Sequence, residues 1–452
     1  MSQDKKRILI LGGGFAGIKC ARKLESYFMI DLNVDITLVS EDNFFLFTPM
    51  LPQVASGMIE TRHIIIPIRT LFVKTIFYES KIKNIDPYGK IVTLEGTNEK
   101  RGVSLHYDFL VLALGSETNF FGIEKMEERV YSMKTLNDAV VLRNRVIDML
   151  EQAENESDPI LKKSLLTFVI VGAGFAGIET AGELMDLLLD ARKYYPHIHK
   201  EDIRVIILDA LSFILPGFNE SLASFALKKL KHRDIEVLIN TKLASFSGSE
   251  VIIEEISGPT RDPVSQQKIG SIQTKTLIWT AGVTPVDTIK NSVFKTSKGG
   301  VIVNEFLEVS DFQGVFAIGD CSYVINPQTQ KPYPPNAQNA EAEAEVAAFN
   351  LRSLIRKEQK KKFKYSSKGQ MVIIGKRTGI ATIFGINLYG FVAWWIWRSI
   401  YLSKIPKLEK RIRILLDWTV DLFFDRDIAR LKVLRHEAPK EYKELDEVDD
   451  VW

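Results

Sequence analysis

The sequence predicts an α/β protein built around two dinucleotide-binding domains of the Rossmann type. Two observations carry this prediction: a glycine-rich signature occurs twice, and each copy lies between a β-rich apolar run and a helix-compatible stretch. The copies read Arg7-Ile-Leu-Ile-Leu-Gly-Gly-Gly-Phe-Ala-Gly17 and Phe168-Val-Ile-Val-Gly-Ala-Gly-Phe-Ala-Gly177. One copy would be weak evidence, because glycine-rich turns occur in many α/β proteins, but two in the same context are strong. Two tight turns without nucleotides are the alternative.

The three glycines of each copy have separate physical roles. The first allows the tight turn from strand to helix, the second leaves room for a pyrophosphate, and the third lets helix and strand pack closely. In chain order they are Gly12, Gly14 and Gly17, then Gly172, Gly174 and Gly177. The free N–H groups at the positive end of the following helix then hold the phosphates.

Each nucleotide site should also have an acid at the end of its second strand, where it binds the adenosine ribose. Asp209 takes this place after Arg204-Val-Ile-Ile-Leu in the second domain. A carboxylate there suits the ribose hydroxyls of NAD and would repel the 2′-phosphate of NADP. In the first domain the strand ends at Ser40, and Glu41 comes one residue later. Glu41 is therefore either the ribose ligand or a solvated loop acid.

Composition bounds the function. A chain of 452 residues predicts two or three domains, and 46% apolar with 26% charged residues is ordinary for a globular protein. A net charge of +2 gives no electrostatic reason to expect nucleic acid. Cys20 and Cys321 lie far apart, which argues against a disulfide scaffold, an iron–sulfur cluster and a cysteine zinc site. The sequence predicts no metal site, and both cysteines are expected to be packing residues in a reducing compartment.

The chain ends also carry expectations. No apolar targeting segment precedes the first strand, so a cleaved secretory signal is not expected. The apolar stretch 388–397 is too short to span a bilayer, for which about 20 residues are needed, and Arg398 interrupts it. We therefore expect no spanning helix and no ion channel.

The C-terminal region reads as a membrane-surface element. The stretch 388–402 holds three of the six tryptophans, and 404–413 is basic. Four residues spaced by four then form a polar stripe, namely Arg413, Asp417, Asp421 and Asp425. Such an amphipathic helix could be core-facing or dimer-forming, but its aromatic and basic flank favours attachment in the plane of the membrane. Residues 436–452 are expected to be a mobile charged tail.

Further segments carry a resemblance to a known family. The stretches 107–116, 277–285 and 314–320 resemble connecting strands and the second FAD motif of the pyridine-nucleotide flavoprotein superfamily. Within it the chain resembles the type II NADH dehydrogenases, which are single-subunit and non-pumping. That likeness rests on Asn43-Phe-Phe-Leu-Phe-Thr-Pro-Met-Leu-Pro52, on Ala337-Gln-Asn-Ala-Glu-Ala342 and on Gly369-Gln-Met-Val-Ile-Ile-Gly375. The match runs from about Lys6 to about Leu434.

The resemblance implies a glutathione-reductase-like fold in which the first signature binds FAD and the second binds NADH. Its domains would be 1–115 with 287–345 for FAD, 116–286 for NADH and 346–452 for membrane attachment. The implied FAD contacts are Gly12, Gly14, Phe15, Ala16, Gly17, Glu41, Thr48, Pro49, Ala113, Gly115, Gly319, Asp320 and Gln338. The implied NADH contacts are Gly172, Gly174, Phe175, Ala176, Gly177, Glu179, Asp209, Ala281 and Gly282.

The implied reaction passes a hydride from NADH to FAD and then reduces a membrane quinone, without ion translocation. Glu179 would be a proton donor or relay, or else a first-turn acid stabilised by the helix dipole. Glu183, one turn later, would contact NAD or, as we favour, be a surface acid. Gln338 would bind a quinone carbonyl or cap a helix, and Lys376 would face the quinone pocket or solvent. The family's second quinone-motif glutamine is Ala342 here, which puts the detailed quinone contacts in question.

Two other functions fit the same sequence. One is a soluble NADH-dependent flavin reductase with another acceptor, and the other is a flavin-based redox sensor. The resemblance favours a peripheral membrane enzyme on the cytoplasmic face or in an equivalent compartment that contains NADH, with a membrane quinone, the bilayer surface and a second copy of the chain as partners.

Overall fold

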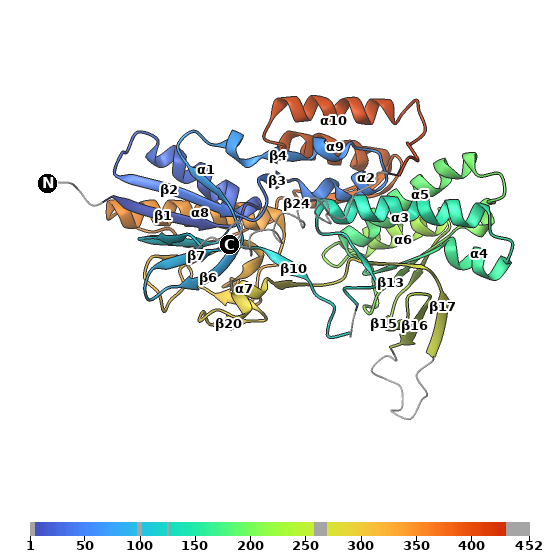
Figure 1. Cartoon of the computed structure of the whole chain (residues 1–452), viewed down its shortest axis with the longest axis horizontal. Coiled ribbons are helices and arrows are strands. Elements are labelled where there is room, and N and C mark those ends of the chain that lie inside the picture. Colours follow the sequence, from blue (N-terminus) through green and yellow to red (C-terminus); the bar gives the residue numbers. More distant parts are fainter. Residues whose placement is uncertain (1–4, 97–101, 124–125, 257–268, 431–452) are drawn as a thin grey trace, which may run out of the picture.

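Each glycine signature lies at the turn between the first strand and first helix of an α/β unit, which confirms the predicted fold class. The computed structural model describes residues 5–96, 102–123, 126–256 and 269–430, and Figure 1 shows the two units side by side. The first unit has a parallel five-stranded sheet with β1 at its centre. In spatial order its strands are β22 (Val315–Ala317), β9 (Phe109–Leu112), β1 (Lys6–Leu11), β2 (Val34–Ser40) and β5 (Ile76–Glu79).

The second unit repeats this plan around a second central strand. Its parallel sheet has the order β11 (Tyr131–Ser132), β18 (Thr276–Trp279), β12 (Thr167–Val171), β13 (Arg204–Leu208) and β14 (Ile235–Leu238). The signature helices are α1 (Phe15–Phe28) and α5 (Phe175–Ala191), and the second unit adds α3 (Leu136–Glu154), α4 (Pro159–Leu165) and α6 (Glu220–His232). Residues 167–171 are all buried, as expected for a central parallel strand covered on both faces.

Each unit also carries a three-stranded antiparallel sheet. In the first unit it is made of β6 (Ile82–Asp86), β7 (Ile91–Leu94) and β8 (Ser104–His106), and in the second of β15 (Thr241–Phe246), β16 (Glu250–Glu255) and β17 (Ile269–Gln273). The sequence repeat is therefore a repeat of the whole unit.

Two adjacent strands carry the chain from the first unit to the second and back. β10 (Ser116–Thr118) pairs antiparallel with β19 (Val283–Pro285). The returning chain forms α7 (Asp287–Lys290), β20 (Thr296–Ser297), β21 (Gly300–Ile302), β22, the short helix η6 (Gly319–Cys321), β23 (Ser322–Tyr323) and α8 (Ala337–Arg356). Helix α8 packs along α1. The predicted domain boundary after residue 345 lies inside α8, which continues to Arg356.

An excursion between β2 and β5 joins the units a second time. It contains β3 (Phe44–Leu46), η1 (Thr48–Met50), α2 (Leu51–Ala55) and β4 (Ile65–Pro67). Helix α2 packs against α3 and α5 of the second unit. The segment that the resemblance places beside the flavin is thus held between the two signature helices.

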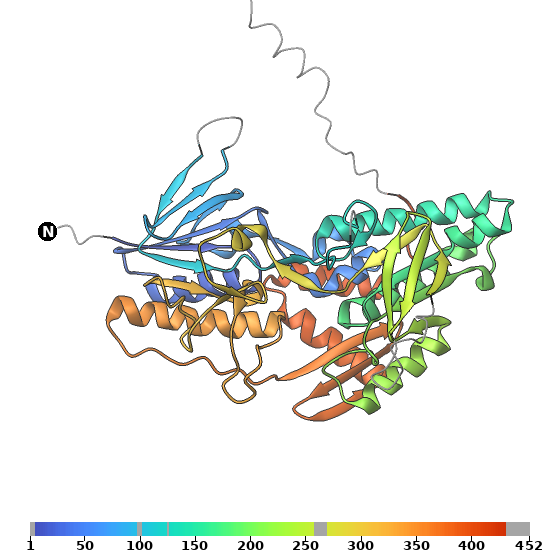
Figure 2. The same ribbon diagram turned by 90° about the horizontal axis from the view of Figure 1, so that it is seen from below.

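The C-terminal module is a sheet of β24 (Gly369–Gly375), β25 (Thr378–Ile383) and β26 (Ile386–Tyr389), followed by α9 (Gly390–Lys404) and α10 (Leu408–Val420). Figure 2 shows this sheet beside the second unit, and β24 packs directly on α5. A Cβ on Gly182 of α5 would lie 2.4 Å from the carbonyl oxygen of Ile374, so glycine is needed for this approach. Among the described residues, no helix is long and apolar enough to cross a bilayer.

The predicted tryptophan cluster is split by its helix. Trp394 and Trp397 face inward and are 8% and 1% exposed, whereas Trp395 is 59% exposed. The prediction of one exposed cluster is therefore wrong. Trp394 and Trp397 are three residues apart and share a helix face, whereas Trp395 lies on another face. The guanidinium of Arg398 lies on the inward side too, over the rings of Trp394 (4.0 Å) and Trp418 (4.6 Å). One of the three tryptophans is therefore available to a membrane surface.

Helix α10 is amphipathic as predicted, but it ends at Val420, and the middle two residues of the predicted polar stripe, Asp417 and Asp421, face the protein while Arg413 and Asp425 are exposed. Asp417 bonds to His63 at 2.5 Å, and Asp421 pairs with Arg426 at 3.2 Å. Apolar side chains are exposed on the other side of α10 and in the turn that follows it. We call them the outer apolar face: Leu408, Ile412, Leu415, Leu416 and Val420 on the helix, and Leu422, Phe423 and Phe424 just after it. Figure 1 shows α10 along one edge of the molecule. A helix with this polarity presents apolar surface outward.

The basic stretch is mostly engaged within the protein. Arg411 donates to the carbonyl oxygens of Ile405 (2.7 Å) and Ser403 (2.9 Å), and Lys410 donates to that of Arg62 (2.7 Å). These side chains hold the end of α9 and a neighbouring loop, so attraction to lipid headgroups is a smaller part of their role than the sequence suggests. The tail predicted at 436–452 lies outside the described residues.

Candidate active site

The first signature borders a cavity of about 320 Å³ whose wall includes residues of the expected FAD site. Those residues are Gly12, Gly14, Phe15, Glu41, Thr48, Ala113 and Gly115. A Cβ on Gly14 would meet no atom within 4 Å, and the backbone there is extended (φ −81°). Gly14 is therefore not needed for packing, and the open space over the N-terminus of α1 fits a pyrophosphate. The residues present fit FAD.

The end of β2 contributes two polar groups to the same cavity. Both Ser40 and Glu41 line it, and the exposed carboxylate of Glu41 pairs with Lys81 at 3.1 Å. Pro49, expected beside the flavin, lies in η1 between the cavity residue Thr48 and α2. The position of Glu41 at the cavity edge is compatible with either a ribose ligand or a loop acid.

The turn that carries Gly319 and Asp320 is held by buried groups that sequence reasoning missed. Glu343 of α8 accepts from the Gly319 N–H (2.6 Å), and burial raises the pKa of Glu343 to about 8. Asp320 accepts from the Ser116 hydroxyl (2.8 Å), and Lys134 donates to the same hydroxyl (2.8 Å). Burial lowers the pKa of Lys134. The available signal was the i, i+4 spacing of Asn339 and Glu343 on one face of α8, where the Asn339 amide donates to Glu343 (2.8 Å).

The second signature repeats the geometry of the first. A Cβ on Gly174 would again meet nothing within 4 Å, with φ at −76°. The carboxylate of Asp209, at the end of β13, accepts from the backbone N–H groups of Ala173 (2.5 Å) and Leu211 (2.8 Å). The acid therefore lies against the phosphate-binding turn, as a ribose ligand requires. Ala281 and Gly282 lie in the adjoining turn after β18, where a Cβ on Gly172 would come 3.0 Å from the Ala281 nitrogen.

Glu179 is held by the C-terminal module. It lies in the first turns of α5, and one oxygen of its carboxyl group accepts from the Ile373 N–H of β24 and from the Trp397 indole N–H of α9, both at 3.1 Å. Burial and, to a smaller extent, the charge of Glu183 raise the pKa of Glu179, the two hydrogen bonds oppose the rise, and the net pKa is about 8. At neutral pH this carboxyl group is mostly protonated, so it can donate a proton. The C-terminal module therefore contacts the helix of the second signature directly, at this candidate site residue.

A line of aromatic side chains joins the two signatures. The ring of Phe15 contacts that of Phe47 (5.8 Å between centroids), Phe47 contacts Tyr401 (6.0 Å), and Tyr401 contacts Trp397 (4.3 Å). Trp397 in turn donates to Glu179. Burial and the charge of Glu179 raise the pKa of Tyr401 above its usual range, so its hydroxyl is neutral at working pH. An apolar wall therefore runs from the FAD cavity to the candidate proton carrier.

The structure separates the two predicted quinone residues. Gln338 lies in the first turn of α8 and donates to the Gly369 carbonyl oxygen (3.1 Å), while the helix is capped by Asn336. Lys376 follows the other end of β24, about 20 Å away at roughly 3.3 Å per strand residue. Its ammonium group lies 3.7 Å from Asp190. Gln338 and Lys376 cannot bind one quinone ring together, because the length of β24 separates them.

The expectation that Glu183 is a surface acid is wrong. Its side chain is 3% exposed, accepts from the Ser56 hydroxyl (2.8 Å) and pairs with Arg426 (3.1 Å). Arg426 follows α10, more than 240 residues later in the chain, so periodicity within α5 gave no sign of this partner. Both cysteines are buried packing residues as predicted, and burial raises the pKa of each thiol to about 12.

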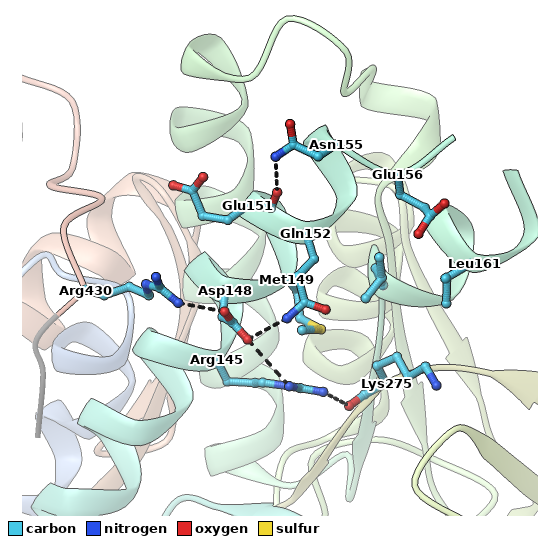
Figure 3. Close-up of a pocket in the computed structure, with 11 residues that line it drawn as sticks. Arg145, Asp148, Met149, Glu151, Gln152, Asn155, Glu156, Leu161, Lys275 and Arg430 are labelled. Carbon is cyan, nitrogen blue, oxygen red and sulfur yellow. Dashed lines mark hydrogen bonds and ion pairs between the residues drawn. The ribbon is translucent and has the colours of Figure 1, made fainter. Parts of the chain in front are cut away.

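A larger hollow lies away from both signatures. It measures about 760 Å³ between α3, α4 and Arg430, and Figure 3 shows its charged lining. Asp148 there pairs with Arg430 (2.7 Å) and accepts from Gln152 (2.8 Å), while Arg145 donates to the Lys275 carbonyl oxygen (2.6 Å). None of the predicted site residues lines it, and its main charges neutralise one another. It is not a candidate nucleotide site.

Comparison with known proteins identifies the family. The model of the pyridine nucleotide-disulphide oxidoreductase family matches residues 6–344, and that of the NDH2 C-terminal domain matches 367–427. The chain belongs to the pyridine nucleotide-disulphide oxidoreductase family. The predicted resemblance to type II NADH dehydrogenases is confirmed by the second match and by the relatives below.

Named relatives share nearly the whole chain. A probable NADH dehydrogenase of Dictyostelium discoideum is 31% identical over 94% of this chain and 91% of that protein. The type II NADH:quinone oxidoreductase Ndh of Mycobacterium tuberculosis is 29% identical over 93% and 89%. Solved NDH2 of Plasmodium falciparum in complex with NADH has the same fold, with a TM-score of 0.85, 20% identity and coverage of 94% and 100%. These family members resemble the chain across both units and the C-terminal module.

A side chain at Gly14 or Gly174 would not clash with the protein itself, so substitutions at these two glycines test nucleotide binding without disturbing the packing. Gly14→Val should fold but lose FAD, since the side chain would fill the pyrophosphate space. Gly174→Val should keep FAD and lose its reduction by NADH. Absorbance of the purified proteins before and after anaerobic addition of NADH separates these outcomes, with thermal unfolding as the check on folding. Normal flavin content and reduction in both variants would contradict the assignment of the two sites.

Proposed function

We propose that this protein oxidises NADH and reduces a quinone, with FAD bound at the first signature and NADH at the second. The observation that carries the proposal is the position of Glu179, on the helix of the second signature and in contact with the NDH2-type C-terminal module. When bound, FAD accepts a hydride from NADH and passes two electrons on. The balanced reaction is NADH + H⁺ + quinone → NAD⁺ + quinol, without ion translocation.

Different residues of the chain bind the two nucleotides, orient the quinone and supply the proton. Residues 12–17 and Asp320 hold FAD, while residues 172–177 and Asp209 hold NADH, whose ribose hydroxyls the Asp209 carboxylate selects over a 2′-phosphate. Gln338 orients the quinone from the start of α8, where Ala342 leaves a smaller side chain than the family's glutamine. Glu179 donates the proton that the hydride does not supply. In this division residues 1–115 and 287–356, with the whole of α8, form the FAD domain, 116–286 the NADH domain and 357–452 the membrane domain.

The outer apolar face fits a bilayer surface better than water. Its eight side chains are 45–77% exposed, and five of them recur at i, i+4, i+7, i+8 and i+12 along α10. An in-plane helix buries such a face at the headgroup boundary. We therefore place the protein on the surface of the membrane that holds its quinone, on the side that contains NADH. A second copy covering the same face is the alternative occupant.

The activity is tested by an anaerobic titration of the purified protein. The flavin spectrum should bleach on addition of NADH and return on addition of a water-soluble quinone. Bleaching that quinone does not reverse would favour a flavin reductase with another acceptor. NADH binding without bleaching would favour a redox sensor, and either result would contradict the proposed reaction.

Membrane attachment is tested with Leu416→Asp/Phe423→Asp, which places two charges on the outer apolar face. Because burying each apolar side chain contributes about 1.5–3 kcal/mol, vesicle binding should fall at least about tenfold. Activity with a long-tailed quinone in vesicles should fall with it, and activity with a water-soluble quinone should not.

The matched control is Tyr88→Asp/Ile269→Asp, two exposed apolar residues (78% and 68%), the first in the turn between β6 and β7 and the second at the start of β17. Figure 1 shows these strands on the side of the molecule away from α10. It should float with vesicles as well as the parent does. Equal flotation of the α10 variant would contradict the proposal. If the α10 variant became a monomer while the parent is a dimer, and still floated with vesicles, the outer apolar face would be an interface with a second copy of the chain.

A further inference from the structure

A buried ion pair lies one helical turn from Glu179. The carboxylate of Glu183 is 3.1 Å from the guanidinium of Arg426, and the two side chains are 4% and 1% exposed. Arg426 also donates to the backbone oxygen of Glu183 (3.0 Å). Residues four apart on a helix share a face, with Cβ atoms about 5–6 Å apart. The charge of Glu183 therefore lies beside the carboxyl group of Glu179.

The cation of this pair comes from the end of the C-terminal module. Arg426 is also bound to Asp421 (3.2 Å), and Arg143 of α3 donates to the carbonyl oxygens of Asp427 (2.7 Å) and Ala429 (3.1 Å). The segment after α10 is thus fixed on α3 and α5. Buried ion pairs add little net stability over well-packed apolar side chains, so stability alone does not account for it.

We propose that the Arg426–Glu183 pair is a positioning element for the reaction, which sets the pH range over which Glu179 gives up and regains its proton. The inference rests on the proposed role of Glu179 as proton donor. Arg426, 3.1 Å away, favours the ionised form of Glu183 in a buried setting where an isolated carboxylate would take up a proton. Glu183 in turn makes loss of the proton from Glu179 less favourable.

The surrounding groups support this assignment. Glu183 is the charged group on α5 that raises the pKa of Glu179 beyond the effect of burial; β24 and α9 contribute N–H donors that lower this pKa, and the neighbouring Tyr401 is neutral. Around Glu183, Ser56 donates from α2. The charged groups that face it are Arg426, Asp186, Asp421 and Arg398. Burial raises the pKa of Glu183, and Arg426 opposes that rise.

The test is Glu183→Gln, which removes the negative charge while Arg426 keeps Asp421 as a partner. Without that charge the pKa of Glu179 should fall from about 8, so that the carboxyl group loses its proton at lower pH. The rate at which a water-soluble quinone reoxidises the reduced enzyme should decline on the alkaline side. The midpoint of this decline should move to lower pH by roughly one unit in the variant. The rate of flavin reduction by NADH should stay within about twofold of the parent.

Two further variants act as controls. Glu220→Gln makes the same acid-to-amide change at an exposed position in the first turn of α6 and should leave the midpoint in place. Glu183→Asp keeps the charge and should return the midpoint towards the parent value.

Glu179→Gln separates this inference from the proposed function. It should abolish the alkaline decline, and a decline that persists would refute the role of Glu179 itself. If Glu179→Gln abolishes the decline and Glu183→Gln leaves its midpoint unchanged, the Arg426–Glu183 inference alone is overturned. Should Glu183→Gln fail to fold, Glu183→Met/Arg426→Met removes the same negative charge together with its cation, leaves Asp421 beside Arg398 as an opposite charge, and should give the same acidic shift.

Discussion

The structure depends on one carboxyl group that accepts hydrogen bonds from a different part of the chain. Glu179 lies just after the second glycine signature, and its two N–H donors, Ile373 and Trp397, belong to the C-terminal module. This contact requires β24 to approach α5 more closely than any side chain at Gly182 would allow. The module that presents apolar surface outward is therefore the same module that holds Glu179, the proposed proton donor.

Several other contacts serve the same arrangement. Trp418 of α10 donates to the buried Gln53 of α2 (3.1 Å), next to the loop beside the FAD cavity. Arg426 reaches back to Glu183, and the ring of Tyr401 lies between those of Phe47 and Trp397. A polar residue buried at such a junction is costly unless it is paired, and each of these has a partner. The C-terminal module, the loop beside the FAD cavity and the helix of the second signature are thus joined by buried, paired contacts.

The glycine signatures, the strand acids and the repeated units could be predicted because their physical causes are local. Gly14 and Gly174 are read from their spacing alone, and Asp209 from the strand that it ends. The burial of Trp394 and Trp397 could not be predicted, because a run of aromatic residues does not show which face of the helix packs against the protein. The burial of Glu183 and the separation of Gln338 from Lys376 depend on long-range contacts, with Arg426 and along β24, which no local pattern encodes.

The most direct measurement is the pH dependence of quinone reduction in Trp397→Phe, which removes one N–H donor to Glu179 while keeping an aromatic ring. Loss of a hydrogen bond to the ionised carboxylate should raise the pKa of Glu179 above about 8. The account predicts that the alkaline decline in flavin reoxidation by a water-soluble quinone moves to higher pH, with flavin reduction by NADH unchanged. An unmoved decline in folded, FAD-loaded protein would contradict the claim that the C-terminal module holds Glu179, the proposed proton donor.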